Sequence, residues 1–298
     1  PPHKALSAAL PNTSSSKITR RPMPITTQTG RFDTEATALL ALESSGATCS
    51  VAACLPSGQW LLATDSGQNN HAAALTLLVQ EVLEGLSLKV ADLGAIAVSI
   101  GPGSYTGLRI GLSAAKGLSL GAGIPILPIP SLRVIALGIR KGTEMAQTAH
   151  PGESGRLAPP SSSAATHTPK NEFYLPLIDA RRLECYAQLY NTDIAPLGEP
   201  FPLILPEWIP SIPAGANVYY GGSGAAKAES YFAQQGWVKS PYTEASALEV
   251  LQLARTDYGR ISFPDPAYLE PLYLKEFQAS QPKPSVLDTL VGHGPAGL

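Results

Sequence analysis

The sequence predicts an α/β protein of two lobes, and three observations support this prediction. The chain has 298 residues, enough for two domains of roughly 100–150 residues each. Hydrophobic residues make up 44% of it, so it can bury a substantial core. Each half begins with short strand-like runs and continues into helical patterns, although no sequence repeat aligns between the halves. We expect an N-terminal lobe over residues 38–140 and a C-terminal lobe over residues 173–277.

The first lobe is predicted to follow the order βββαβαβα. Three apolar runs separated by tight-turn residues indicate an antiparallel meander. Apolar residues then recur at helical spacing, and two further strand–helix pairs follow, the last helix capped by Ser131. The expected strands are 38–43, 49–55, 59–64, 95–100 and 125–129, and the expected helices are 71–86, 105–120 and 131–139.

The second lobe is predicted to be strand-rich before it becomes helical. The expected strands are 173–178, 185–190, 202–205 and 218–220, and the expected helices begin at 225 and span 244–255.

Three polar segments flank the predicted lobes. Residues 1–37 are rich in Ser, Thr and Pro and are expected to be a disordered extension. Their composition resembles a transit peptide, but an over-extended start with Met23 as the initiator is the interpretation we favour. Residues 141–172 are expected to form a surface insertion or linker, and residues 278–298 a flexible tail.

Charge is distributed unevenly along the chain. The formal net charge is −2, but residues 1–32 hold five basic residues and no acid, so residues 33–298 sum to −7. A body of that sign binds nucleic acid poorly by itself, and a partner would supply most contacts to an RNA substrate. The three cysteines form no CxxC pair, as expected of buried thiols in a reducing compartment. With no apolar run long enough to span a bilayer, we expect a soluble cytoplasmic protein.

The strongest motif is the glycine-rich segment GPGSYTGLRIG at 101–111, where a buried strand turns onto a helix. Such a turn exposes backbone N–H groups and the positive end of the helix dipole, but it matches neither a Walker loop nor the dinucleotide fingerprint. Ser104 is expected to be the N-cap. Each interior glycine costs a helix about 1 kcal/mol relative to alanine, so either its own sheet or another chain must approach this helix closely. Its small residues are Gly107, Gly111, Ala114, Ala115 and Gly117.

The segment GPGSYTGLRIG…AKGL, preceded by LALESS and followed by GIPILPIPSL, resembles the TsaB (YeaZ) family, as do LIDARR at 177–182 and YLEPLYLKEF at 268–277. The resemblance implies a two-lobed, ribonuclease H-like fold of the actin, hexokinase and Hsp70 type. It also implies a glycoprotease-like but non-catalytic scaffold. Such a scaffold joins a TsaD-like catalytic subunit and a TsaE-like ATPase in placing threonylcarbamoyl on the adenosine beside the tRNA anticodon.

This resemblance implies a partner surface on the helices at 71–86 and 105–120. The same surface would form a homodimer without the TsaD-like partner, and tRNA would be contacted only indirectly. The expected interface residues are His71, Leu75, Leu78, Val82, Thr106, Gly107, Arg109, Ile110, Gly111, Ala114 and Gly117.

The resemblance also suggests a nucleotide, ATP or ADP, at the partner interface. The candidate nucleotide-binding residues are Glu43, Gly101, Gly103, Ser104, Asp179, Gly222 and Gly224. No metal site is expected, because TsaD-like catalysts pair two histidines four residues apart on a helix, whereas Leu75 lies four residues after His71.

The alternative is a nucleotide-dependent enzyme acting alone, either a small-molecule kinase or a peptidase. A kinase would use Glu43 and Asp179 as its carboxylates, although local turns explain both residues equally well. No GxSxG elbow surrounds Ser104, so a hydrolase nucleophile is not predicted there. No catalytic residue is assigned on the leading interpretation.

Overall fold

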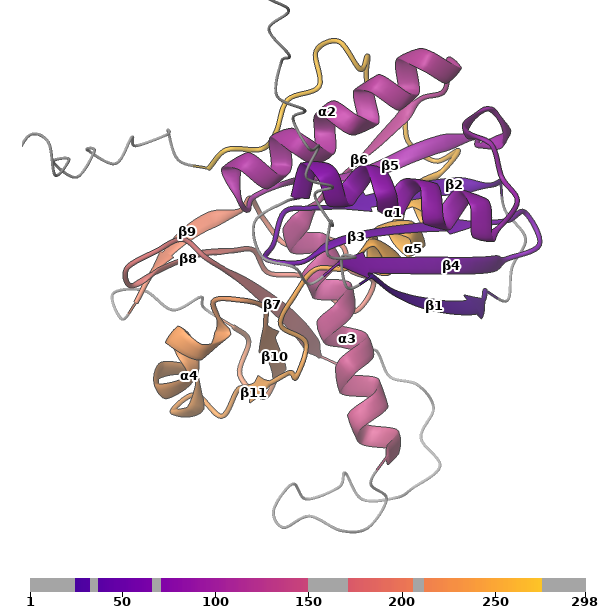
Figure 1. Cartoon of the computed structure of the whole chain (residues 1–298). Coiled ribbons are helices and arrows are strands. Elements are labelled where there is room, and N and C mark those ends of the chain that lie inside the picture. The colour runs from indigo at the N-terminus through magenta and orange to yellow at the C-terminus, as the bar shows by residue number, and fades with distance from the viewer. Residues whose placement is uncertain (1–24, 33–36, 66–70, 150–170, 206–211, 275–298) are drawn as a thin grey trace, which may run out of the picture.

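The computed structural model describes residues 25–32, 37–65, 71–149, 171–205 and 212–274. These residues form two mixed sheets with helices between and around them, which confirms the α/β class and the two lobes (Figure 1). The first sheet contains β1 (Ile25–Arg31), β2 (Leu39–Glu43), β3 (Cys49–Cys54), β4 (Gln59–Asp65), β5 (Ala95–Gly101) and β6 (Ile126–Pro130). The second sheet contains β7 (Glu172–Asp179), β8 (Glu184–Ala187), β9 (Phe201–Ile204), β10 (Asn217–Gly221) and β11 (Val238–Lys239).

The two sheets share one topology. The order β4-β3-β2-β5-β6 in the first sheet corresponds strand for strand to β9-β8-β7-β10-β11 in the second. In the first sheet, β2 pairs antiparallel with β3 and parallel with β5. In the second sheet, β7 likewise pairs antiparallel with β8 and parallel with β10. The halves therefore repeat one strand arrangement without sharing an alignable sequence.

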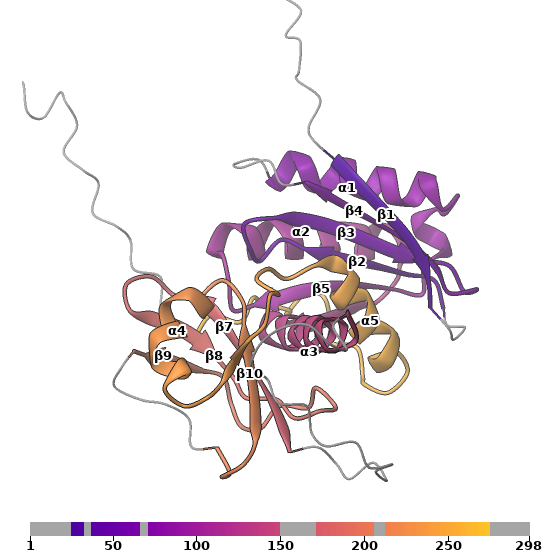
Figure 2. The ribbon, with the colours of Figure 1, turned by 90° about the horizontal axis from the view of Figure 1, so that it is seen from below.

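The helices are α1 (His71–Gly85), α2 (Tyr105–Ala122), α3 (Ser131–Ala149), α4 (Ala225–Ala233) and α5 (Ala247–Asp257), with a short 3-10 helix η1 (Val90–Asp92). Helices α1 and α2 lie on one face of the first sheet, and α3 and α5 lie on its other face (Figures 1 and 2). The packing between the lobes is reciprocal. Helix α3 follows the first sheet but packs on β7 and β10, whereas α5 follows the second sheet but packs on β2 and β3.

This crossing corrects the predicted lobe boundaries. Helix α5 belongs structurally to the first lobe although it lies within residues 173–277. The chain after it stays with that lobe, because Leu272 N donates to Ile100 O over 2.7 Å. The apolar side chains of α3, α5 and the facing strands join in one core between the sheets, so the lobes are not separable by cutting the chain at one point.

Two of the flanking segments are also more ordered than predicted. Strand β1 lies inside residues 1–37 and pairs antiparallel with β4 along its whole length, so the prediction of disorder is wrong for Ile25–Arg31. Helix α3 continues to Ala149, into the segment predicted as an insertion. Lys141 Nζ, at the start of that segment, donates to Glu249 Oε1 of α5. The two-residue β11 was not predicted. Residues 1–24, 150–170 and 275–298 lie outside the described residues.

The cysteines Cys49, Cys54 and Cys185 are buried thiols without disulfides. Among the helices that the structure describes, none combines the length and the apolarity needed to cross a membrane.

Candidate functional site

The glycine-rich loop is fastened to the turn that follows β2. Ser104 N donates to Ser45 O over 2.8 Å, and Ser44 Oγ donates to Gly107 O over 2.8 Å. Ser104 Oγ accepts from Gly107 N at 3.2 Å, which confirms Ser104 as the N-cap of α2. The start of α2 and the end of β2 therefore form one hydrogen-bonded unit.

The glycines at the start of α2 are explained by this contact. A Cβ atom at Gly103 would lie 2.6 Å from Ser45 O, and one at Gly107 would lie 2.0 Å from Ser44 O. Neither distance is compatible with a side chain, so the loop after β2 reaches α2 only because these positions lack one. Gly117 differs, because in the part of the chain that the structure describes nothing beyond its own turn of helix lies within 4 Å of its Cβ position.

Glu43 is a completely buried carboxyl at the end of β2. Its Oε1 accepts from Ser45 N at 2.6 Å, and its Oε2 accepts from Ser99 Oγ. Burial raises the pKa of Glu43, and the nearby Glu244 carboxylate adds to this, although the bonds from Ser45 and Ser99 act in the opposite direction. Ser99 was not singled out from the sequence. As the lone polar residue in the apolar run 95–100, it carried a signal that could have found it.

Asp179 ends β7 in a separate network within the second lobe. Its Oδ1 accepts from Lys227 Nζ at 2.5 Å and from Arg181 N at 2.7 Å, and its N donates to Ser223 Oγ over 3.1 Å. Burial alone would raise the pKa of Asp179, but the bonds from Lys227 and Arg181 outweigh it and lower the pKa. The contact with Lys227 was not predicted.

Gly222 and Gly224 lie in the turn that covers this network. Gly224 N donates to Leu177 O over 2.9 Å, and a Cβ at Gly222 would lie 2.4 Å from Leu177 O. Gly222 also has a φ of +99°, a conformation that favours glycine. The turn is therefore shaped by its contact with the end of β7.

The candidate nucleotide-binding residues thus fall into two groups. The first group lies in the first lobe and consists of Glu43 with Gly101, Gly103 and Ser104 of the glycine-rich loop. Gly101 N donates to Ser131 Oγ over 3.1 Å. Asp179, with the turn at 222–224, forms the second group. Within the described residues, no hydrogen bond or ion pair joins Glu43 to Asp179. Nucleotide binding across the two groups stays a prediction.

Helices α1 and α2 place the expected interface residues in two different environments. Leu75, Leu78 and Val82 are at most 2% exposed and lie in the core beneath α1, and Gly107 and Gly111 are also buried. These five buried residues cannot contact a partner themselves, and they affect a partner surface only by positioning the two helices. The outward-facing predicted residues are Thr106, Arg109 and Gly117, with His71, Ile110 and Ala114 half-buried.

The exposed surface of these helices contains further residues that the sequence argument missed. We define the α1–α2 surface as the exposed residues between 72 and 80 in α1 and between 106 and 117 in α2: Ala72, Ala73, Thr76, Leu77, Gln80, Thr106, Arg109, Ser113 and Gly117. Their residue types are mostly small and uncharged, with Arg109 as the single charge. Helical spacing alone could have selected them, since they alternate with the buried stripe.

His71 makes a local contact at the start of α1, where its Nε2 lies 3.2 Å from Ala47 O. No cluster of three or more His, Cys, Asp or Glu side chains suited to a metal ion occurs in the part of the chain that the structure describes.

Comparison with known proteins finds relatives that share these features. A family model described as "TsaD: tRNA N6-adenosine threonylcarbamoyltransferase" matches residues 65–151. The tRNA threonylcarbamoyladenosine biosynthesis protein TsaB of Haemophilus influenzae is 29% identical over 247 residues, which cover 80% of this chain and 93% of that protein. The Escherichia coli protein of the same name is 32% identical over 105 residues, covering 34% of this chain and 43% of that protein.

The fold is also found among solved structures. YeaZ from Pseudomonas aeruginosa superposes with a TM-score of 0.63 at 22% identity, over 80% of this chain and 100% of that one. This likeness assigns the two lobes to the actin-like fold, in agreement with the repeated strand order. In its sequence relationships and in its fold, the chain is similar to the TsaB (YeaZ) proteins, and residues 65–151 are also similar to the TsaD family.

Proposed function

We propose that this chain is a non-catalytic subunit of the complex that forms threonylcarbamoyladenosine beside the tRNA anticodon, and that it docks on a TsaD-like catalytic subunit. The names of its TsaB relatives support the pathway. The match to the TsaD family spans residues 65–151, which include the whole of α1, α2 and α3. A TsaD-like partner would therefore present an equivalent helix pair, and two equivalent pairs can meet about a pseudo-twofold axis.

The observation that carries this proposal is the open position of Gly117. An interior glycine costs a helix about 1 kcal/mol relative to alanine. Gly107 and Gly111 repay that cost through the contact with Ser44. Nothing in the described chain lies within 4 Å of a Cβ at Gly121, near the end of α2, or at the interior Gly117. Close approach by another chain gives this glycine a purpose that the monomer does not.

The chemistry of the α1–α2 surface favours a protein partner. One charge among its residues is compatible with burial at the centre of an interface, where charged residues are depleted. Arg109 Nη1 donates to Tyr105 Oη over 3.0 Å, and its guanidinium lies 5.1 Å from the centre of that ring. The Tyr105 ring is 5.1 Å from the Tyr273 ring. Tyrosine and arginine are the side chains that dominate binding energy at interfaces, so this cluster is a suitable anchor beside α2.

A TsaE-like ATPase and a nucleotide, ATP or ADP, at the partner interface complete the proposed assembly, and the chain would pair with itself when the TsaD-like subunit is absent. The alternative of an enzyme acting alone has weaker support. Glu43 is fully buried and held by Ser45 and Ser99, and Asp179 is occupied by Lys227. Neither carboxylate is arranged to serve as a base at a common site.

Reconstitution tests the proposal. The full chain would be combined with the TsaD-like and TsaE-like proteins of the same organism, unmodified tRNA and an activated threonylcarbamoyl donor. Modified adenosine would be measured by mass spectrometry of the digested tRNA. We expect modification that depends on this chain. Equal modification when the chain is omitted, or modification by the chain alone, would contradict the non-catalytic role.

A further inference from the structure

A pocket of about 730 Å³ lies between α3, α5 and the 191–194 loop, with Phe32 at one side. Its size falls in the range of small-molecule sites. It includes no residue of the glycine-rich loop or of the α1–α2 surface, and the function proposed above does not involve it. Five basic and two acidic side chains line it, a surplus of three positive charges in a protein whose residues 33–298 sum to −7.

Two of the basic side chains in this pocket are committed to the fold. Arg133 pairs with Asp257 through both guanidinium ends and donates from Nε to Ile194 O over 3.3 Å. Lys141 Nζ lies 2.7 Å from the nearly buried Glu249 carboxylate. These contacts fix the walls of the pocket by tying α3 to α5, and they leave little capacity for a ligand.

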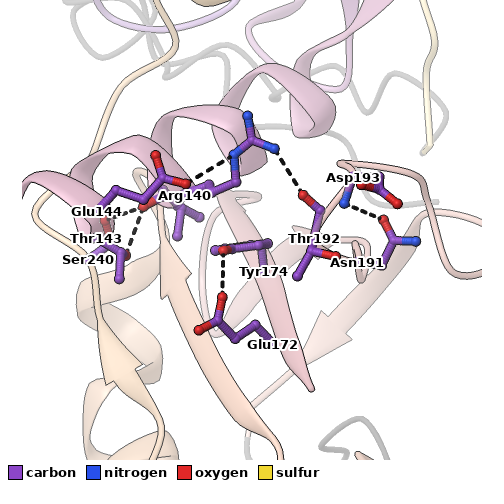
Figure 3. Close-up of polar contacts among 10 residues, drawn as sticks. Arg140, Thr143, Glu144, Glu172, Tyr174, Asn191, Thr192, Asp193 and Ser240 are labelled. Atoms are coloured by element: carbon purple, nitrogen blue, oxygen red, sulfur yellow. Dashed lines mark hydrogen bonds and ion pairs between the residues drawn. The ribbon is translucent and has the colours of Figure 1, made fainter. Parts of the chain in front are cut away.

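Arg140 is committed only in part (Figure 3). A guanidinium has five N–H donors, and Arg140 uses one in a 2.9 Å bond to Thr192 O. Its Nε lies 3.7 Å from Glu144 Oε1, which is too long for a hydrogen bond. That nitrogen is buried and has no hydrogen-bond partner in the described chain. Because Nε is buried while the side chain as a whole is 31% exposed, the donors that Arg140 can offer to the pocket are those on its terminal nitrogens.

Arg260 supplies a second donor group from a different element. It follows α5, it is exposed, and no hydrogen bond or ion pair involves its guanidinium within the described residues. Guanidinium groups bind phosphate through paired N–H donors better than ammonium groups do. The lining of one pocket therefore holds guanidinium donors for a phosphate group on two different elements.

The rest of the pocket is suited to the other parts of a nucleotide. Leu137 and Leu253 are buried and give it an apolar floor, which matches the face of a base. Asp193 is an exposed acceptor on its rim. Carboxylates accept hydrogen bonds from hydroxyl groups, and a ribose offers such groups. We propose that this pocket binds a nucleotide through its phosphate, with Arg140 and Arg260 as the phosphate donors.

The nucleotide could be free or part of an RNA strand, and one experiment separates these sources. Isothermal titration calorimetry of the full chain would use AMP, inorganic phosphate and an unmodified tRNA anticodon stem-loop as probes. The variants are Arg140→Met and Arg260→Met, with Arg182→Met, on the exposed turn before β8, as the matched control. Loss of one charge-assisted contact should weaken binding about tenfold or more.

We expect AMP to bind more tightly than inorganic phosphate, both pocket variants to weaken it, and the control to bind as the native chain does. If AMP binds the native chain and both pocket variants bind it more weakly, the site takes a free nucleotide. If AMP does not bind but the stem-loop does, and both pocket variants weaken it, the site takes a nucleotide within RNA. Three results would overturn the proposal. These are no binding of AMP or of the stem-loop, unchanged affinity in both pocket variants, or an affinity loss in only one of them, such as Arg140→Met. The last would report displacement of the loop that Arg140 holds.

Discussion

A Cβ atom at Gly111 would lie 2.3 Å from Ser44 Oγ. Ser44 Oγ is itself fixed by its bond to Gly107 O, 2.8 Å long, so it cannot withdraw without breaking that bond. The close approach between α2 and the loop after β2 is therefore an internal packing contact. It separates Gly107 and Gly111, which the fold requires, from Gly121 and Gly117, whose Cβ positions are open in the described chain.

This distinction predicts opposite effects of one substitution at two positions. Gly111→Ala should lower the free energy of unfolding by about 1–3 kcal/mol, since its methyl group overpacks the contact with Ser44. Gly117→Ala should raise it by about 1 kcal/mol, since alanine is the better helix former and its methyl group meets nothing. Urea denaturation of the two variants measures both values. Equal effects at the two positions would contradict this account of the helix.

The buried carboxyl of Glu43 predicts a pH effect. Because burial raises the pKa of the folded Glu43 above its ordinary value of 4.5, the unfolded chain loses this proton at a lower pH than the folded chain. The contribution of Glu43 to stability therefore falls as the pH rises from 4.5 toward the raised pKa. Glu43→Gln removes this titration.

We expect Glu43→Gln to lose less stability than the native chain as the pH is raised from 4.5 to neutrality. Thermal melts of both proteins across that range test this expectation. Parallel melting profiles would show that Glu43 does not titrate differently in the folded state.

The pair Arg133–Asp257 predicts an energetic link between α3 and α5. The two side chains are 22% and 12% exposed, so the pair is screened less than a surface pair. Asp257→Asn leaves Arg133 without its counter-charge and should cost about 1–3 kcal/mol. A double-mutant cycle with Arg133→Met measures the coupling by chemical denaturation. Strictly additive effects would show that the pair contributes nothing beyond its separate side chains.

The cap of α2 predicts a smaller effect. Ser104 is exposed, and its Oγ accepts from Gly107 N at 3.2 Å. Ser104→Ala should therefore cost about 1 kcal/mol, and Ser104→Asp should preserve most of the stability. Melting temperatures of the two variants give the comparison. A loss of the same size in both would mean that the side chain serves some purpose other than capping.

Much of the fold could be predicted because the decisive signals were local. The meander at 39–65 follows from apolar runs and turn residues, and the start of α2 follows from a serine cap after a glycine-rich turn. What failed was non-local. Polar β1 is ordered because its backbone pairs with β4, a contact that its own residues do not encode.

The same reason explains which part of the candidate site could not be predicted. Leu75, Leu78 and Val82 form an apolar helical stripe, and such a stripe does not distinguish burial on its own sheet from burial on a partner. The structure assigns these three to the core. Similarly, Lys227 is 48 residues from Asp179, and only the parallel pairing of β7 and β10, with the turn after β10, brings them together.

Size-exclusion chromatography of this chain with the TsaD-like protein of the same organism tests the central claim most directly. Gly117→Arg should fold normally, because its Cβ position meets nothing in the described chain, but should place a bulky charge in the proposed interface. Ala233→Arg, at the exposed end of α4, is the matched control. The account predicts that the native chain and the control co-elute with the partner, while Gly117→Arg elutes alone with a normal melting temperature. Co-elution of Gly117→Arg, or separate elution of the native chain, would contradict it.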